Sequence, residues 1–258
     1  TYTVTSTFGA AWATSPRSGI SKSYSFTFQF KIDRTAPTMN NVSTSSTGKY
    51  TNSSTYVSAS DSMSGVECIY MKTPGSSSYG NMGTSTTVSS SGTNGLYSFY
   101  AKDKAGNTSR TYFLYLDTVK PTGTIKNSSG TEITGSYTNQ TFSYSATDSG
   151  SGISYLQYKK PGSSSWLTYT SGTSISASAA SGTYQFRAVD KAGNISATKS
   201  ITLDSSKPTM TLYSGDVSVS NGYKSIANYI KATATDSGSG VKTIYVKKPG
   251  ASSYTEYA

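Results

Sequence analysis

Apolar and polar residues alternate along this chain in short runs. Phe142, Tyr144 and Ala146 alternate with Ser and Thr, and Tyr184 and Phe186 repeat the pattern further on. A period of two places every second side chain on the same face of a strand, so one face is buried and the other solvated. The runs are broken by Gly, Pro and Ser clusters, and none shows a helical period. The sequence therefore predicts an all-β protein.

Residues 118–204 divide into seven such runs. The expected strands are residues 122–126, 141–148, 153–158, 166–169, 174–179, 184–190 and 197–203. Seven short strands with turn signals every 8–12 residues or so are typical of an immunoglobulin-like β-sandwich.

Two short motifs recur along the chain at nearly constant spacing. Asp61–Gly65 returns as Asp148–Gly152 and Asp236–Gly240, at steps of 87 and 88 residues. Asp103–Asn107 returns as Asp190–Asn194, also 87 residues later. Solenoid repeats usually run to only about 20–50 residues, so each repeat is a whole small domain.

The repeat sets the expected domain organisation. Residues 34–117 and 118–204 are complete units, predicted to be seven-strand sandwiches joined end to end. Residues 1–33 are predicted to be the C-terminal part of a preceding unit, and residues 205–258 the N-terminal part of a further one. The simpler interpretation is that the sequence is a segment of a longer tandem array. The alternative is that the two end pieces complement each other between chains.

The sixth strand of each unit provides the expected core. Its inward positions are Tyr97, Phe99, Ala101, Tyr184, Phe186 and Ala188. A Gly-x-Tyr sequence opens this strand in both units, where a tyrosine corner would sit with its hydroxyl bonded back to the chain. The alternative is an ordinary buried tyrosine.

Charge and hydropathy exclude some partners. The formal net charge is +10, but the 22 Lys and Arg residues are scattered. No basic stripe of the kind that nucleic-acid binding needs is present. We interpret the charge as a solvated, mildly cationic surface, with attraction to an anionic cell wall or glycan as the alternative. No run of about 18 apolar residues predicts a membrane span.

The residue types argue against catalysis. There is no histidine, which removes the usual general base and the commonest zinc ligand. The one cysteine, Cys68, lies in a strand-like run and is read as a packed thiol. Paired carboxylates can hydrolyse glycosides, but here they recur in every unit, which an active site would not do. We therefore expect a non-catalytic protein.

The recurring aspartates do suggest a site. Asp33 begins an Asp-x-x-x-Pro motif that returns at Asp117 and Asp204. In an immunoglobulin-like topology the second and sixth strands end at the pole where the first begins. Three carboxylates should therefore gather at each domain junction. The two expected groups are Asp33, Asp61 and Asp103, and Asp117, Asp148 and Asp190.

Two explanations of these groups stay open. Clustered carboxylates repel one another, and Ca²⁺, which takes 6–8 oxygen ligands, would hold them together. Alternatively, each aspartate caps its own turn through backbone N–H groups, and lysines balance the charge. The candidate lysines are Lys104, Lys120, Lys191 and Lys207.

Taken together, the motifs resemble a known family. The series Ala-x-Asp-x-x-Ser-Gly, Gly-x-Tyr-x-Phe-x-Ala-x-Asp-Lys-Ala-Gly-Asn and Asp-x-x-x-Pro is similar to the bacterial Ig-like repeats of large secreted and cell-surface proteins. Those repeats serve as stalks of adhesins and as spacers in polysaccharide-acting enzymes. The resemblance covers most of residues 34–258. Residues 1–33 depart from it, with a longer loop at Phe8–Ser21 where Asp-Lys-Ala-Gly-Asn is expected.

The resemblance implies a non-catalytic stalk or spacer of a bacterial surface, adhesin-like protein, located outside the cell. The expected partners are neighbouring Ig-like domains. One alternative is adhesive modules that bind cell-wall or host glycans or a host protein through tyrosines and Trp12 and Trp166. The other is a spacer in a secreted polysaccharide enzyme or a phage structural protein.

Overall fold

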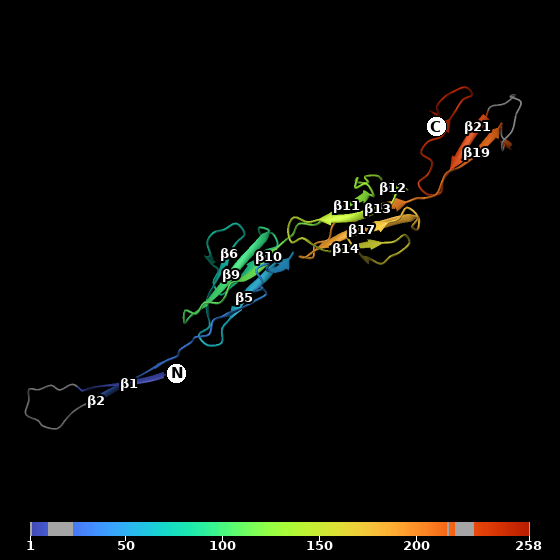
Figure 1. Cartoon of the computed structure of the whole chain (residues 1–258). Helices are drawn as coiled ribbons and strands as arrows, with labels where there is room; N and C mark the ends of the chain where they lie inside the picture. The colour runs from blue at the N-terminus through green and yellow to red at the C-terminus, as the bar shows by residue number, and fades with distance from the viewer. Residues whose placement is uncertain (1, 10–22, 216, 220–229, 258) are drawn as a thin grey trace, which may run out of the picture. The chain divides into compact units, whose positions relative to one another are not determined.

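The computed structural model describes residues 2–9, 23–215, 217–219 and 230–257, with side chains from residue 30 onward except 217–219. The chain divides into two compact units, Thr1–Thr118 and Val119–Ala258. Figure 1 labels many of the strands within them. The described residues form strands and turns, as predicted. None of them belongs to a helix with the length and hydropathy needed to cross a membrane.

The first unit contains a sandwich of two sheets. The smaller sheet has the order β3-β5-β8, and the larger has the order β4-β10-β9-β6-β7. The strands of the smaller sheet are β3 (Thr38–Asn40), β5 (Thr55–Ser60) and β8 (Ser85–Val88). Those of the larger are β4 (Lys49–Thr51), β6 (Val66–Lys72), β7 (Gly80–Asn81), β9 (Gly95–Asp103) and β10 (Tyr112–Leu116).

The second unit repeats this arrangement. Its smaller sheet has the order β11-β13-β16, and its larger has the order β12-β18-β17-β14-β15. The strands of the smaller sheet are β11 (Thr122–Asn127), β13 (Phe142–Thr147) and β16 (Ser174–Ile175). Those of the larger are β12 (Tyr137–Thr138), β14 (Ile153–Lys159), β15 (Leu167–Tyr169), β17 (Gly182–Asp190) and β18 (Lys199–Leu203). Both units therefore contain an immunoglobulin-like sandwich.

Each sandwich contains eight strands, one more than the seven that the sequence predicted. The extra strands, β4 and β12, are two or three residues long and pair in parallel with the last strand. Lys49 lies opposite Leu114, and Tyr137 lies opposite Thr202. A segment this short shows no alternation. The expected strand at 174–179 is also shortened to the two residues of β16.

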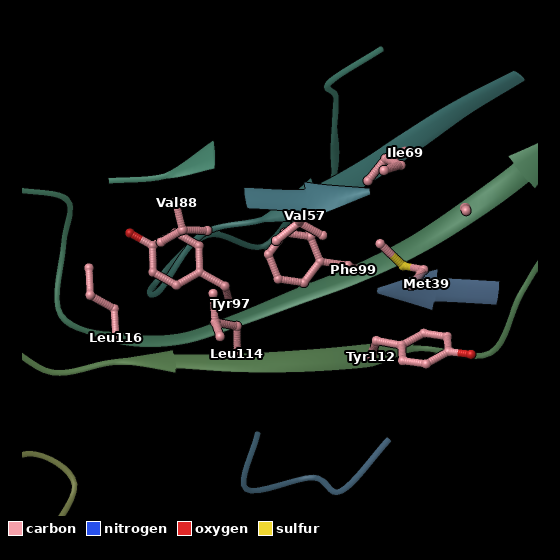
Figure 2. Close-up of a cluster of buried hydrophobic side chains, with 10 residues drawn as sticks. Met39, Val57, Ile69, Val88, Tyr97, Phe99, Tyr112, Leu114 and Leu116 are labelled. Atoms are coloured by element: carbon pink, nitrogen blue, oxygen red, sulfur yellow. The ribbon is translucent and has the colours of Figure 1, made fainter. Parts of the chain in front are cut away.

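The cores lie between the sheets. Every predicted inward residue of the sixth strands is buried, and Phe99, Ala101, Phe186 and Ala188 are fully so. Figure 2 shows Tyr97 and Phe99 of β9 pointing toward Val57 and Val88 of the facing sheet. The alternation with a period of two therefore predicted correctly which face of this strand lies in the core.

Both tyrosine corners are present. The hydroxyl of Tyr97 donates to the carbonyl of Thr93 at 2.9 Å, and that of Tyr184 donates to the carbonyl of Ala180 at 3.0 Å. Each bond reaches four residues back along the chain, across the corner that leads into β9 or β17. Burial raises the pKa of both tyrosines, as expected for a phenol held away from water.

The chain enters and leaves each sandwich at opposite poles. Antiparallel pairing puts Thr38, at the start of β3, opposite Ser60, at the end of β5. β9 ends at this same pole with Asp103. β10 runs back and ends at Leu116, opposite Gly95 at the start of β9. The first strand therefore begins at one end of the sandwich and the last finishes at the other.

The end pieces are β-structure as well. β1 (Tyr2–Gly9) and β2 (Ser23–Phe30) form an antiparallel hairpin, as the sixth and seventh strands of a unit would. The loop expected at Phe8–Ser21 begins inside β1 and otherwise lies outside the described residues. The other end piece contains β19 (Thr209–Ser214), β20 (Val217–Val219), β21 (Ile230–Thr235), β22 (Tyr245–Val246) and β23 (Thr255–Glu256).

Candidate functional site

Three aspartates meet at the pole where the chain enters the first sandwich. Asp33 precedes β3, Asp61 follows β5, and Asp103 ends β9. Each offers a carboxylate oxygen, and these oxygens all lie within 4.8 Å of one another. Asp103 is fully buried, whereas Asp33 and Asp61 are partly exposed. The topology thus brings together the first predicted group.

Asp61 caps the turn that follows it. Its Oδ1 accepts hydrogen bonds from the backbone N–H groups of Met63, at 3.1 Å, and Gly65, at 2.8 Å. Gly65 has a φ of +76°, a backbone conformation that residues with a side chain rarely adopt. The other carboxylate oxygen, Oδ2, is buried and has no hydrogen-bond partner among the described residues. A buried carboxylate oxygen without a partner is costly.

Asp33 joins the incoming linker to this turn. Its Oδ1 accepts from the N–H of Thr35 at 2.8 Å, and its Oδ2 accepts from the N–H of Ser64 at 2.9 Å. The bonds from Thr35 and Ser64 hold the pKa of the Asp33 carboxyl below its usual value of 3.8. Asp33 is therefore a carboxylate at neutral pH and has no proton to give as a general acid.

Asp103 and Asn107 close the third side of the site. The two Asp103 oxygens accept from the backbone N–H of Asn107 at 2.8 Å and from its Nδ2 at 2.7 Å. The same Nδ2 also donates to the backbone carbonyl of Asp33 at 3.1 Å. The asparagine of Asp-Lys-Ala-Gly-Asn thus ties the linker to the end of β9. The recurrence of the motif alone does not reveal this role of the asparagine.

The charge of this group is not balanced by an ion pair among the described residues. Among the described residues, no lysine or arginine lies within ion-pair distance of Asp33, Asp61 or Asp103. Lys102, which precedes Asp103, forms an ion pair with Glu67 at 3.1 Å. Lys104, one of the four candidate lysines of the turn-cap explanation, forms no ion pair with these aspartates. A hollow of about 520 Å³ adjoins Asp33, and Lys31 and Lys104 are among the residues that line it.

The other repeats carry the same local structure. Asp148 Oδ1 accepts from the N–H groups of Gly150 and Gly152 at 3.0 and 2.8 Å, and its Oδ2 is again buried without a hydrogen-bond partner. Asp190 accepts from the N–H and Nδ2 of Asn194 at 2.8 and 2.7 Å.

Asp117 ends the first unit and is fully buried, whereas Asp148 and Asp190 belong to the second. The expected gathering of these three aspartates across the two units stays a prediction.

The same aspartate-capped turn occurs a third time, within the second unit. Asp236 Oδ1 accepts from Gly238 and Gly240 at 3.0 and 2.9 Å, as Asp61 does in its own turn. Asp204 accepts from Ser206 and, at 2.6 Å, from the N–H of Ser239. The hydroxyl and N–H of Ser206 and the N–H of Ser239 lower the pKa of the Asp204 carboxyl. The link between linker and turn seen at Asp33 therefore recurs at Asp204.

Aromatic side chains offer a weaker candidate site. Several of the tyrosines lie in the two cores. Trp166 is partly buried, with the Arg187 guanidinium 4.2 Å and the Lys159 amine 4.9 Å from its ring centroid. Both cations therefore already contact the Trp166 ring, which the adhesive alternative would use to bind a glycan or a host protein. Trp12 lies outside the described residues.

Comparisons with known proteins add little about function. No known family profile matches the chain, and no curated protein sequence matches it. Among 14 matching chains of solved structures is one described as Clostridium thermocellum CbhA fibronectin(III)-like modules. That match covers 64% of this chain and 92% of the other, at 16% identity and a TM-score of 0.34. A likeness at this level carries no functional argument, so the fold rests on the sheets described above.

Proposed function

We propose that the chain is a non-catalytic spacer made of tandem immunoglobulin-like modules. The observation that supports this role is that the chain enters and leaves each sandwich at opposite poles. A module connected at opposite poles can add its long dimension to an array. With β9 at nine residues and about 3.3 Å per residue, that dimension is about 30 Å. The location that suits such a spacer is a bacterial cell surface or a secreted protein.

Small-angle X-ray scattering of the whole chain tests the spacer role. A compact globule of 258 residues has a radius of gyration of about 18 Å. We expect a value well above this, because two complete modules and two end pieces follow one another along the array. A radius near that of a globule would show that the modules pack side by side and would refute the spacer.

The competing roles require a ligand or a substrate. For a spacer we expect no binding to a glycan array and no turnover of glycans or peptides by the purified chain. Variants Asp148→Asn and Asp190→Asn are the matched controls for hydrolysis. Turnover that these variants abolish would make the aspartates catalytic. Binding that Trp166→Ala abolishes would favour the adhesive role.

A second proposal is that the Asp33 group holds one Ca²⁺ ion, which stiffens the link between the linker and the sandwich. The supporting observation is Asp61 Oδ2, which is buried without a hydrogen-bond partner beside two other carboxylates. Calcium takes oxygen ligands from carboxylates and backbone carbonyls. The N–H bonds to Asp61 Oδ1 and Asp33 also support the turn-cap explanation, and both roles fit the same residues. A calcium titration of thermal stability separates the two.

A further inference from the structure

The hairpin between β14 and β15 has a sequence that occurs three times along the chain. Lys-x-Pro-Gly begins at Lys72, Lys159 and Lys247, and an aromatic residue follows each lysine seven positions later. The glycine of each copy has a positive φ, which glycine adopts readily after proline in a tight turn. In both sandwiches the lysine amine lies near the ring, 5.4 Å from the Tyr79 centroid and 4.9 Å from that of Trp166. The hairpin thus sets a cation beside an aromatic ring.

The second sandwich adds another cation to this pair. The guanidinium carbon of Arg187, in β17, lies 4.2 Å from the centroid of the Trp166 ring. The Arg187 Nε donates to Gln157 Oε1 at 2.8 Å, and Gln157 lies directly opposite Arg187 in the paired strands. A guanidinium held by both a ring and an amide has lost much of its conformational freedom before a ligand arrives.

These two cations are available to a ligand. Neither Lys159 nor Arg187 forms an ion pair with any residue that the structure describes. The two terminal nitrogens of Arg187 make no hydrogen bond within the same part of the chain. Phe186 and Ala188, its neighbours along β17, are buried in the core, so Arg187 projects from the outer face of the sheet. The side chains of Lys159, Arg187 and Trp166 are all partly exposed.

The corresponding place in the first sandwich is filled by aromatic rings. By the strand register, Tyr100 stands where the second sandwich has Arg187. Its ring stacks on Tyr70 at 4.8 Å, and Tyr79 meets its edge at 4.9 Å. The combination of tryptophan, arginine and lysine is therefore particular to the second of the two sandwiches.

We propose that Arg187, Lys159 and Trp166 form a surface that binds phosphate groups carried by a polymer. The terminal nitrogens of Arg187 donate side by side to two phosphate oxygens, and the Lys159 amine supplies a second positive charge. A phosphate monoester carries close to two negative charges and three acceptor oxygens, so it matches two cations better than a carboxylate with its single charge. The three side chains lie on the outer face of a sheet, where a long molecule can pass across them. A neutral glycan offers these cations no charge and is not a ligand.

Isothermal titration calorimetry of the whole chain with inorganic tripolyphosphate tests this surface. We expect binding that weakens as salt is added, because dissolved ions screen the attraction between opposite charges. Arg187→Gln removes the charge and the paired donors, and should weaken binding about tenfold or more. Lys126→Gln removes an exposed cation from β11, in the smaller sheet of the same sandwich, and is the matched control that should bind as the native chain does. No binding by the native chain, or equal weakening by the two variants, would overturn the proposal.

Two further variants separate the geometry of the guanidinium from its charge. Arg187→Lys keeps the charge but loses the planar pair of donors, so its affinity should lie between those of the native chain and Arg187→Gln. Lys159→Gln leaves β17 untouched and should also weaken binding, which decides the matter if thermal melts show that Arg187→Gln is unfolded. Native affinity in both of these variants would refute the site.

A second ligand tests the preference for phosphate. Citrate carries its charges on carboxylates and should bind more weakly than tripolyphosphate at the same ionic strength. Equal affinities would contradict the assignment of phosphate. This binding goes beyond the spacer role and does not depend on it. The Arg187→Gln chain should keep the native radius of gyration in solution scattering, so a failure of phosphate binding and a failure of the spacer are separate results.

Discussion

Replacing Phe186 with alanine is expected to unfold the sandwich at residues 118–204 or bring it close to unfolding. The Phe186 side chain is fully buried, and its ring stacks on Tyr144 at 5.0 Å and meets the edge of Tyr169 at 5.3 Å. A Phe→Ala change in a packed core costs about 3–5 kcal/mol, because transfer free energy is lost and a cavity remains. A domain of fewer than 90 residues has only about 5–10 kcal/mol of stability in total.

Denaturant unfolding measures the loss of stability, and hydrogen exchange shows which sandwich loses it. Exchange should accelerate across β11–β18 and stay unchanged in the core around Phe99, which belongs to a separate cluster. Leu167→Ala, at a 42% exposed position of the same sandwich, is the control and should cost little. Superimposable unfolding curves for Phe186→Ala and the native chain would mean that this face is not the core.

The sequence predicted the sandwich core because burial there follows a simple period. Alternate residues of β9 and β17 point the same way, so Tyr97, Phe99 and Phe186 could be assigned to the core from spacing alone. The gathering of Asp33, Asp61 and Asp103 at one pole of the first sandwich was predictable for a related reason. Strand direction fixes which strand ends meet, and motif spacing shows that aspartates stand at those ends.

Other features have no periodic signal. β4 and β12 are too short to alternate, and they form only because a parallel partner lies beside them. The bond from Asn107 Nδ2 to the Asp33 carbonyl joins residues 74 positions apart, so spacing along the chain does not reveal it.

Calcium is expected to raise the melting temperature of the first sandwich, and a chelator is expected to lower it again. An ion that binds only the folded state stabilises it by about 2.7 kcal/mol when its concentration is 100 times the dissociation constant. The gain should arise at the Asp33 group, where three carboxylates lie together and, among the described residues, none of them forms an ion pair with a lysine or arginine. Thermal melts in millimolar Ca²⁺ and in chelator measure it.

Asp61→Asn separates the ion from the turn cap. Asparagine keeps an Oδ1 that accepts from Met63 and Gly65, so the turn retains its hydrogen bonds. It replaces the unpartnered Oδ2 with an uncharged amide, which removes repulsion from Asp33 and Asp103 and an oxygen ligand for the ion. Without calcium this variant should therefore melt at or above the native temperature. In a calorimetric titration it should bind one calcium ion fewer. If the native chain melts at the same temperature with calcium and with chelator, the aspartates act as turn caps alone.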